Sequence, residues 1–102
     1  MTHQALADGL VDVALLFTTD ASMTEEGLVE LADDRGLQPA ESITPLLRSE
    51  VVDQLGGGLV TAIDAVSAKL TTAAVRDLNS RIGVPGADAA SVASAWLSEV
   101  QS

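Results

Sequence analysis

The chain has 102 residues, of which 47% are hydrophobic and only 2% aromatic, so it is long enough for one small domain with a core of Leu, Val, Ile and Ala. Its net charge of −10, from 15 acidic and 5 basic residues, argues against binding to nucleic acid or to an anionic membrane surface, because both require clustered Lys and Arg. The absence of Cys excludes disulfides, a thiol nucleophile and a Cys-ligated metal.

The N-terminal stretch predicts a short helix followed at once by a strand. Thr2 is a suitable N-cap and Gly9 a suitable end for a helix over residues 2–8. Residues 11–17 form a short run dominated by Val and Leu, which is typical of a strand buried on both faces. We therefore expect Phe17, at the end of this run, to be buried.

The middle of the chain predicts two more short strands. Ser22 and Glu25 have the spacing of a capping box, but Gly27 would stop the helix that they begin. Residues 28–31 and 42–48 are the second and third candidate strands, and a proline makes the latter an edge strand or an interrupted one. A short helix through residues 51–55, capped by one of the preceding serines, is the alternative for the end of this region.

The second half predicts three helices with apolar stripes. Residues 56–58 are the only glycine run in the chain and indicate a separator between helices, because no Lys-Ser/Thr comes after them as it would in a phosphate loop. Asp77 and Arg81 have i,i+4 spacing, and Asp88 is a suitable cap for the last helix. We expect two residues of these stripes, Ile63 and Trp96, to be buried. The three stripes consist of Leu59, Ile63, Val66 and Leu70; Val75, Leu78 and Ile82; and Val92, Trp96, Leu97 and Val100.

Polar residues come directly after the first predicted strand. Thr18, Thr19 and Asp20 stand at its carboxyl end, where open α/β sheets place their ligand sites. The same residues could simply end the strand and cap the next element. No nucleophile, base and orienting residue can be combined into a catalytic set, His3 has no convergent partners, and the acidic pairs lack the spacing of a calcium loop. We therefore expect no enzyme activity, no cofactor and no metal site.

An ordered set of segments resembles a known family. It comprises residues 7–14 with 17–20, residues 28–36, residues 38–41 through Pro45, and residues 59–72 with Leu78 and Asn79. Together they are similar to the carboxyl-terminal part of the substrate-binding components of ABC transporters for glycine betaine, choline and related osmoprotectants. No single motif is diagnostic, but the resemblance covers nearly the whole chain.

The resemblance implies an α/β fold that is part of a two-lobe periplasmic-binding-protein-like structure, with short strands in the first half and three helices in the second. Residues 1–102 would then form a single partial domain. It also implies that a signal peptide and a lipid-attachment Cys belong to an upstream region. No signal peptide is visible in this sequence, which as written would stay in the cytoplasm, whereas the family works outside the cytoplasmic membrane.

The resemblance also implies a ligand site. The segment Phe17, Thr18, Thr19 and Asp20 is similar to one that lies at the cleft between the lobes, where family members often carry a Tyr at the position of Phe17. They often carry another aromatic residue near residues 38–41, where this chain has Ala40 and Glu41. Aromatic faces hold quaternary ammonium groups by cation–π attraction. We expect Phe17 to offer a ring face and Glu41 an opposite charge.

The function that this resemblance implies is capture of a small solute, a quaternary amine or a similar compound, for delivery to ABC permease subunits. The expected partners are this solute and the permease, without nucleic acid and without insertion into the membrane. A stand-alone acidic interaction module without a transport role is the alternative. If the chain is such a fragment, unpaired strand edges and uncovered apolar faces would favour self-association of the isolated chain.

Overall fold

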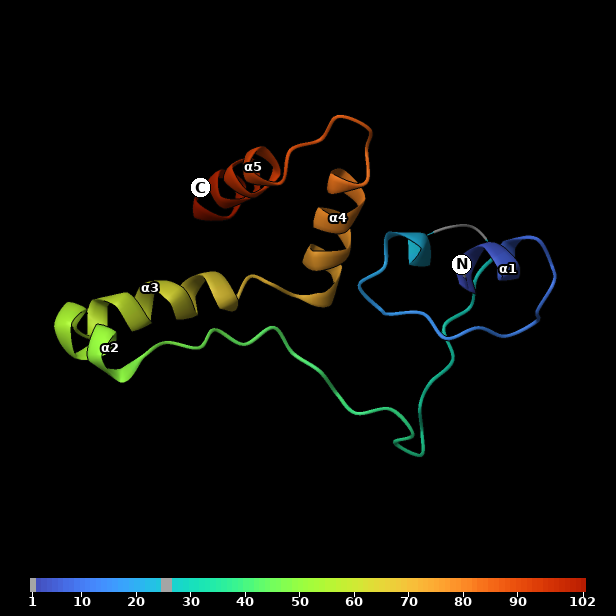
Figure 1. The fold of residues 1–102 in the computed structure, drawn as a ribbon, viewed down its shortest axis with the longest axis horizontal. Helices are drawn as coiled ribbons and strands as arrows, with labels where there is room; N and C mark the ends of the chain where they lie inside the picture. Colours follow the sequence, from blue (N-terminus) through green and yellow to red (C-terminus); the bar gives the residue numbers. More distant parts are fainter. Residues whose placement is uncertain (1, 25–26) are drawn as a thin grey trace. The chain divides into compact units, whose positions relative to one another are not determined.

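The computed structural model of the chain describes residues 2–24 and 27–102, and over these residues it is helical (Figure 1). Contacts divide the chain into two units, Met1–Glu30 with Thr72–Ser102 and Leu31–Thr71. The elements in chain order are α1 (Thr2–Ala7), the 3-10 turn η1 (Ala21–Thr24), α2 (Ser49–Leu55), α3 (Gly57–Ser67), α4 (Thr72–Ile82) and α5 (Ala89–Gln101).

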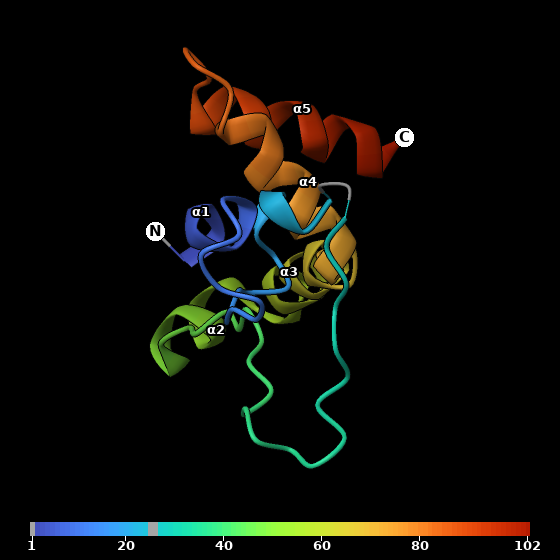
Figure 2. The same cartoon turned by 90° about the vertical axis from the view of Figure 1, so that its right-hand side faces the viewer.

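The first unit is built on α4, which contacts both α5 and η1 (Figures 1 and 2). Asp88 begins α5 as its N-cap, because its carboxylate accepts hydrogen bonds from the Ser91 backbone N–H at 2.9 Å and the Ser91 hydroxyl at 2.8 Å. Further along α5, Trp96 is only 7% exposed and is the one buried hydrophobic side chain among the described residues. The small core of this unit therefore depends on Trp96.

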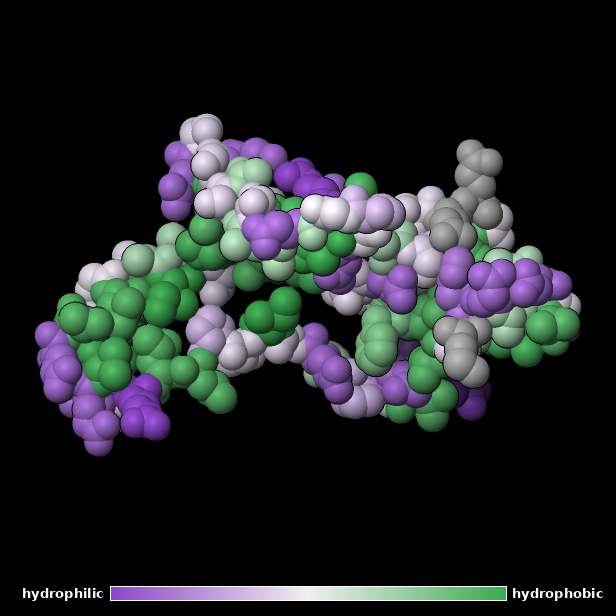
Figure 3. All heavy atoms as spheres, turned by 45° about the horizontal axis from the view of Figure 1, so that its top comes forward, coloured by the Kyte–Doolittle hydropathy of each residue, from purple (hydrophilic) through white to green (hydrophobic). Residues whose placement is uncertain are grey.

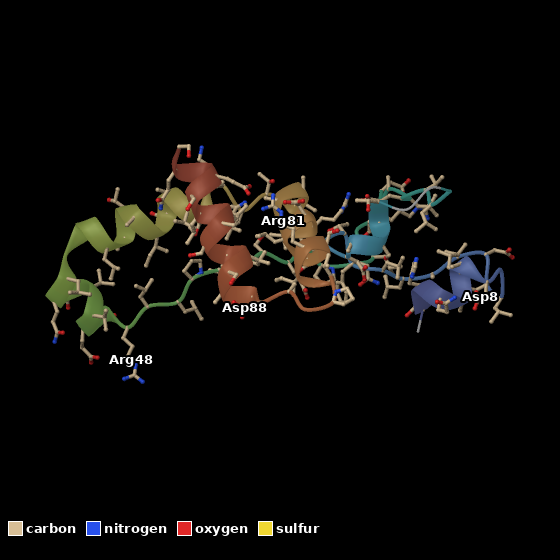
Figure 4. The ribbon with its side chains drawn as sticks, turned by 90° about the horizontal axis from the view of Figure 1, so that it is seen from above. Asp8, Arg48, Arg81 and Asp88 are labelled. Atoms are coloured by element: carbon tan, nitrogen blue, oxygen red, sulfur yellow. The ribbon has the colours of Figure 1, made fainter. Side chains whose placement is uncertain are left out.

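An ion network joins the two C-terminal helices. Arg81 of α4, labelled in Figure 4, donates two hydrogen bonds to Glu99 of α5, at 2.8 and 3.1 Å. It also lies 2.8 Å from the carboxylate of Asp77. The hydrogen bonds to Glu99 raise the pKa of Arg81 and lower the pKa of Glu99. The predicted Asp77–Arg81 pair is confirmed, and the bidentate bond to Glu99 fixes how α4 and α5 meet.

The second unit holds the short helices α2 and α3 next to each other (Figure 1). Gly56 lies between them with φ 75° and ψ −177°, a conformation that is essentially confined to glycine. Its N–H donates to the Val52 carbonyl at 2.8 Å, and its own carbonyl accepts from Leu59 at 3.3 Å. Gly56 thus ends one helix and begins the next, which confirms the predicted separator.

Much apolar surface of the second unit stays in contact with solvent (Figure 3). Leu37 is 83% exposed and Leu46 is 93% exposed, in the irregular segment that precedes α2. Asp33 holds one turn of this segment, because its carboxylate accepts from the backbone N–H groups of Leu37 and Gln38 at 2.9 and 2.8 Å. These hydrogen bonds keep the pKa of Asp33 below its ordinary value.

The predicted helices are present. The helices over the second half correspond to α3, α4 and α5, residues 51–55 adopt the helical alternative as part of α2, and the N-terminal helix ends before Gly9. The stripe of α3, including Ile63, is half-buried rather than buried. Of the proposed capping box, Glu25 lies outside the described residues, and Ser22 belongs to η1 instead of capping it.

The described residues contain no strand, so the structure does not show the three strands predicted in the first half. Residues 11–17 are irregular, with Val13 72% and Leu15 70% exposed, and the prediction that Phe17 is buried is wrong, because 76% of this residue is exposed. A strand needs a neighbour that accepts and donates the ladder hydrogen bonds. The described part of this chain offers these segments only helices and loops.

Candidate functional site

Four of the predicted site residues form one tight turn in the first unit. The backbone N–H of Asp20 donates to the carbonyl of Phe17 at 3.0 Å, which closes the turn over residues 17–20. The Asp20 carboxylate oxygen Oδ1 accepts from the backbone N–H of Ser22 at 2.9 Å and from its hydroxyl at 2.7 Å. Asp20 therefore caps η1, as the simpler interpretation of this sequence expected.

Helix α4 holds the same turn from outside. The Nε–H of Arg76 donates to the carbonyl of Thr18 at 2.8 Å, and the side-chain amide of Asn79 donates to the carbonyl of Thr19 at 2.8 Å. Residues three apart lie on one face of a helix, so two donors of α4 meet two successive carbonyls of the turn. The contact between α4 and η1 continues this arrangement (Figure 2).

The turn presents an aromatic ring to solvent. Phe17 is 76% exposed, and Thr18 is exposed as well, whereas Thr19 and Asp20 are half-buried. The hydrogen bond from the backbone of Ser22, together with the smaller effect of that from its hydroxyl, lowers the pKa of Asp20 below its ordinary value of 3.8. At neutral pH the turn therefore combines an exposed ring with an ionised carboxylate three residues away.

Glu41, the remaining predicted site residue, belongs to the second unit and is exposed. Its participation in the same site stays a prediction. Sequence reasoning missed Arg76, Asn79 and Ser22, which hold the turn. The one signal in the sequence was that Arg76 and Asn79 have i,i+3 spacing on a helix with a predicted apolar stripe. Their acceptors are 58 and 60 residues away in the chain. These acceptors are backbone carbonyls, which every residue has, so the sequence does not identify them.

The described part of the chain offers no metal site and no continuous membrane span. No group of three or more His, Cys, Asp or Glu side chains could hold a metal ion there. No single described helix is long and apolar enough to span a membrane. Only α3 and α4 taken together, as one bent and interrupted segment, have the length and composition of a membrane span.

The chain belongs to the family described as the substrate-binding domain of ABC-type glycine betaine transport systems, which matches residues 1–99. This family consists of transport components, not enzymes, and implies a periplasmic-binding-protein-like fold. The glycine betaine-binding protein YehZ of Escherichia coli (strain K12) is similar to it, with 30% identity over 89 residues. The aligned part covers 87% of this chain and 29% of that relative, so the chain spans under a third of the relative's length. No solved structure matches the chain significantly.

Proposed function

We propose that this chain supplies one wall of a site for a quaternary ammonium solute, such as glycine betaine or choline, in an ABC importer. The observation that carries the proposal is the exposed ring of Phe17 on a turn that α4 holds in place. A quaternary ammonium group prefers the face of an aromatic ring. The ionised carboxylate of Asp20 adds charge of the right sign, and Glu41 and the two threonines complete the predicted set.

One wall gives little affinity by itself. An exposed cation–π contact contributes about 0.5–1 kcal/mol, whereas the loss of translational and rotational freedom on association costs at least about 4 kcal/mol. Ligand sites that bind small molecules well bury about 70–90% of the ligand surface. These terms leave no net attraction, so we expect the chain alone to bind such a solute much more weakly than with a Kd of about 1 mM.

The remaining wall would come from the rest of a two-lobe protein of which this chain represents the carboxyl-terminal part. In that protein, residues 11–17, 28–31 and 42–48 would gain the neighbouring strands that they lack here. The exposed apolar side chains of these segments, among them Val13, Val29 and Ile43, support this view, because a sheet and its covering layers would bury them. The complete protein would work outside the cytoplasmic membrane and deliver its solute to ABC permease subunits.

The test is an NMR titration of the 15N-labelled chain with choline, glycine betaine and carnitine. We expect small shifts that centre on residues 17–20 and that do not saturate at millimolar concentrations of the solute. Phe17→Ala should abolish them, whereas Phe17→Tyr should preserve them, because the ring face is retained. The neutral isostere 3,3-dimethyl-1-butanol is the matched control for choline, since it keeps the shape and lacks the charge.

Equal responses to choline and to its neutral isostere would refute the cation–π basis of the proposal. Shifts elsewhere on the chain that survive Phe17→Ala would refute the location of the site. Micromolar binding by the chain alone would contradict the view that it forms only one wall. If the chain instead responds to no quaternary amine but binds a basic protein domain, the alternative of an acidic interaction module, which the net charge of −10 favours, takes precedence.

A further inference from the structure

We infer that Arg76 and Asn79 are positioning residues for this site: they hold the carbonyls of Thr18 and Thr19 and so keep the Phe17 ring in its exposed orientation. The inference rests on the proposed function, because a fixed ring is of use only if the ring meets a ligand. It goes further by naming two residues of α4 whose hydrogen bonds, 2.8 Å each, reach backbone atoms and not the side chains of the predicted site.

The two bonds together restrict the peptide between Thr18 and Thr19. Two successive carbonyls of the turn are bound by two donors of one helix face, so rotation of the intervening peptide would break at least one bond. The donors come from α4, which Arg81 ties to α5 by the bidentate bond to Glu99. The turn is thus attached to a pair of helices that are themselves held together.

The other hydrogen bonds described for the turn are local. The bond from the Asp20 N–H to the Phe17 carbonyl closes it, and the Ser22 bonds to Asp20 anchor its end. Both lie within residues 17–22, so they join the turn to η1, which in turn contacts α4. Without Arg76 and Asn79, the turn would keep its internal closure and its link to η1, and it would lose the two bonds that hold its Thr18 and Thr19 carbonyls against α4.

A fixed direction matters for a weak contact. Ordering a loop on binding opposes association, so a turn that is already held binds more tightly than a mobile one. In a site where one exposed ring supplies most of the attraction, this difference decides whether binding is measurable.

The two side chains allow conservative substitutions that separate position from packing. Asn79→Asp keeps the shape of the side chain and replaces the amide donor with an acceptor that repels the Thr19 carbonyl. Arg76→Lys keeps the charge and removes the Nε–H donor. Ser80→Ala, at an exposed position of the same helix, is the matched control.

The experiment measures 15N order parameters and choline-induced shifts for the full chain and for Asn79→Asp, Arg76→Lys, the double variant and Ser80→Ala. We expect order parameters of residues 17–20 to fall from about 0.85 to below about 0.6 in the double variant. The choline response should weaken by about 2- to 10-fold for each bond lost. Far-UV circular dichroism and Trp96 fluorescence should stay unchanged, which shows that α4 and α5 remain folded. Ser80→Ala should match the parent chain in all readouts.

The outcomes separate the positioning role from the proposed function. Order parameters that remain high in the double variant would overturn the positioning role, whatever happens to ligand binding. A mobile turn that binds choline as well as the parent turn would overturn it too. A parent chain without any choline response, but with a turn that becomes mobile in the double variant, would refute the proposed function and leave the mechanical role of α4 established.

Discussion

Replacing Gly56 with alanine should loosen α2 and α3, whereas the same change two residues later should tighten them. Gly56 has φ 75° and ψ −177°, a region that L-residues enter at a cost of about 1–3 kcal/mol. No atom lies within 4 Å of the position that a Cβ would take at Gly56, so the penalty comes from the backbone and not from a clash. Gly58 is the second residue of α3, and alanine is favoured over glycine in a helix by at most about 0.5–1 kcal/mol.

Amide hydrogen exchange measures this difference locally. Because about 1.4 kcal/mol corresponds to a factor of ten, protection of the α2 and α3 amides should fall about 5- to 150-fold in Gly56→Ala and rise about 2- to 5-fold in Gly58→Ala. The amides of α4 and α5 belong to the other unit and serve as an internal control. Equal changes in the two variants would refute the reasoning, since both add the same methyl group next to the same helices. So would an increase in protection in Gly56→Ala.

Three further predictions concern the packing and the charges. Trp96→Ala should lower the free energy of unfolding by about 3–5 kcal/mol, measured by circular dichroism in urea. The control Leu46→Ala, at a residue that is 93% exposed, should change it by less than about 0.5 kcal/mol. Similar losses in the two variants would contradict a core centred on Trp96. Asp33 and Asp88 have pKa values lowered from 3.8 by hydrogen bonds to their carboxylates, so their contribution is complete above that pH and lost as the pH falls through the folded-state values. Thermal melts from about pH 6 to about pH 2 should therefore show decreasing stability below about pH 4, and Asp88→Asn should reduce the dependence. The exposed apolar side chains predict self-association that grows with concentration and with salt, which screens the charge of −10; a clean monomer by sedimentation at high concentration and high salt would argue against it.

The sequence predicted the helices well because their signals are local. The stripe that contains Trp96, the cap at Asp88 and the Asp77–Arg81 pair all depend on neighbours within one or two helical turns, and the structure contains each of them. Strands depend on partners elsewhere, and the run over residues 11–17 looks the same whether or not a neighbouring strand exists. Composition therefore predicted a burial that the described structure does not provide.

The candidate site, too, could be predicted from the sequence only where the signal is local. Residues 17–20 could be selected from the sequence, because polar side chains after an apolar run are typical of a strand end that builds a site and because the stretch resembles a family segment. The hydrogen bonds from Arg76 and Asn79 to this turn could not be predicted from the sequence, because the acceptors are carbonyl oxygens, which every residue has. The prediction for Glu41, in the other unit, still depends on the resemblance.

The route of the chain through the first unit has a consequence for synthesis on the ribosome. The chain leaves this unit after Glu30 and returns at Thr72, so the carbonyl of Thr18 emerges 58 residues before the arginine that binds it. At a translation rate of about 5–20 residues per second, that delay is about 3–12 s. During this interval the turn over residues 17–20 lacks the two side-chain donors that bind its carbonyls, and only the emergence of α4 supplies them. A ribosome stalled before residue 76 should therefore carry a turn without these two hydrogen bonds, and one stalled well after α5 should carry a turn that α4 holds.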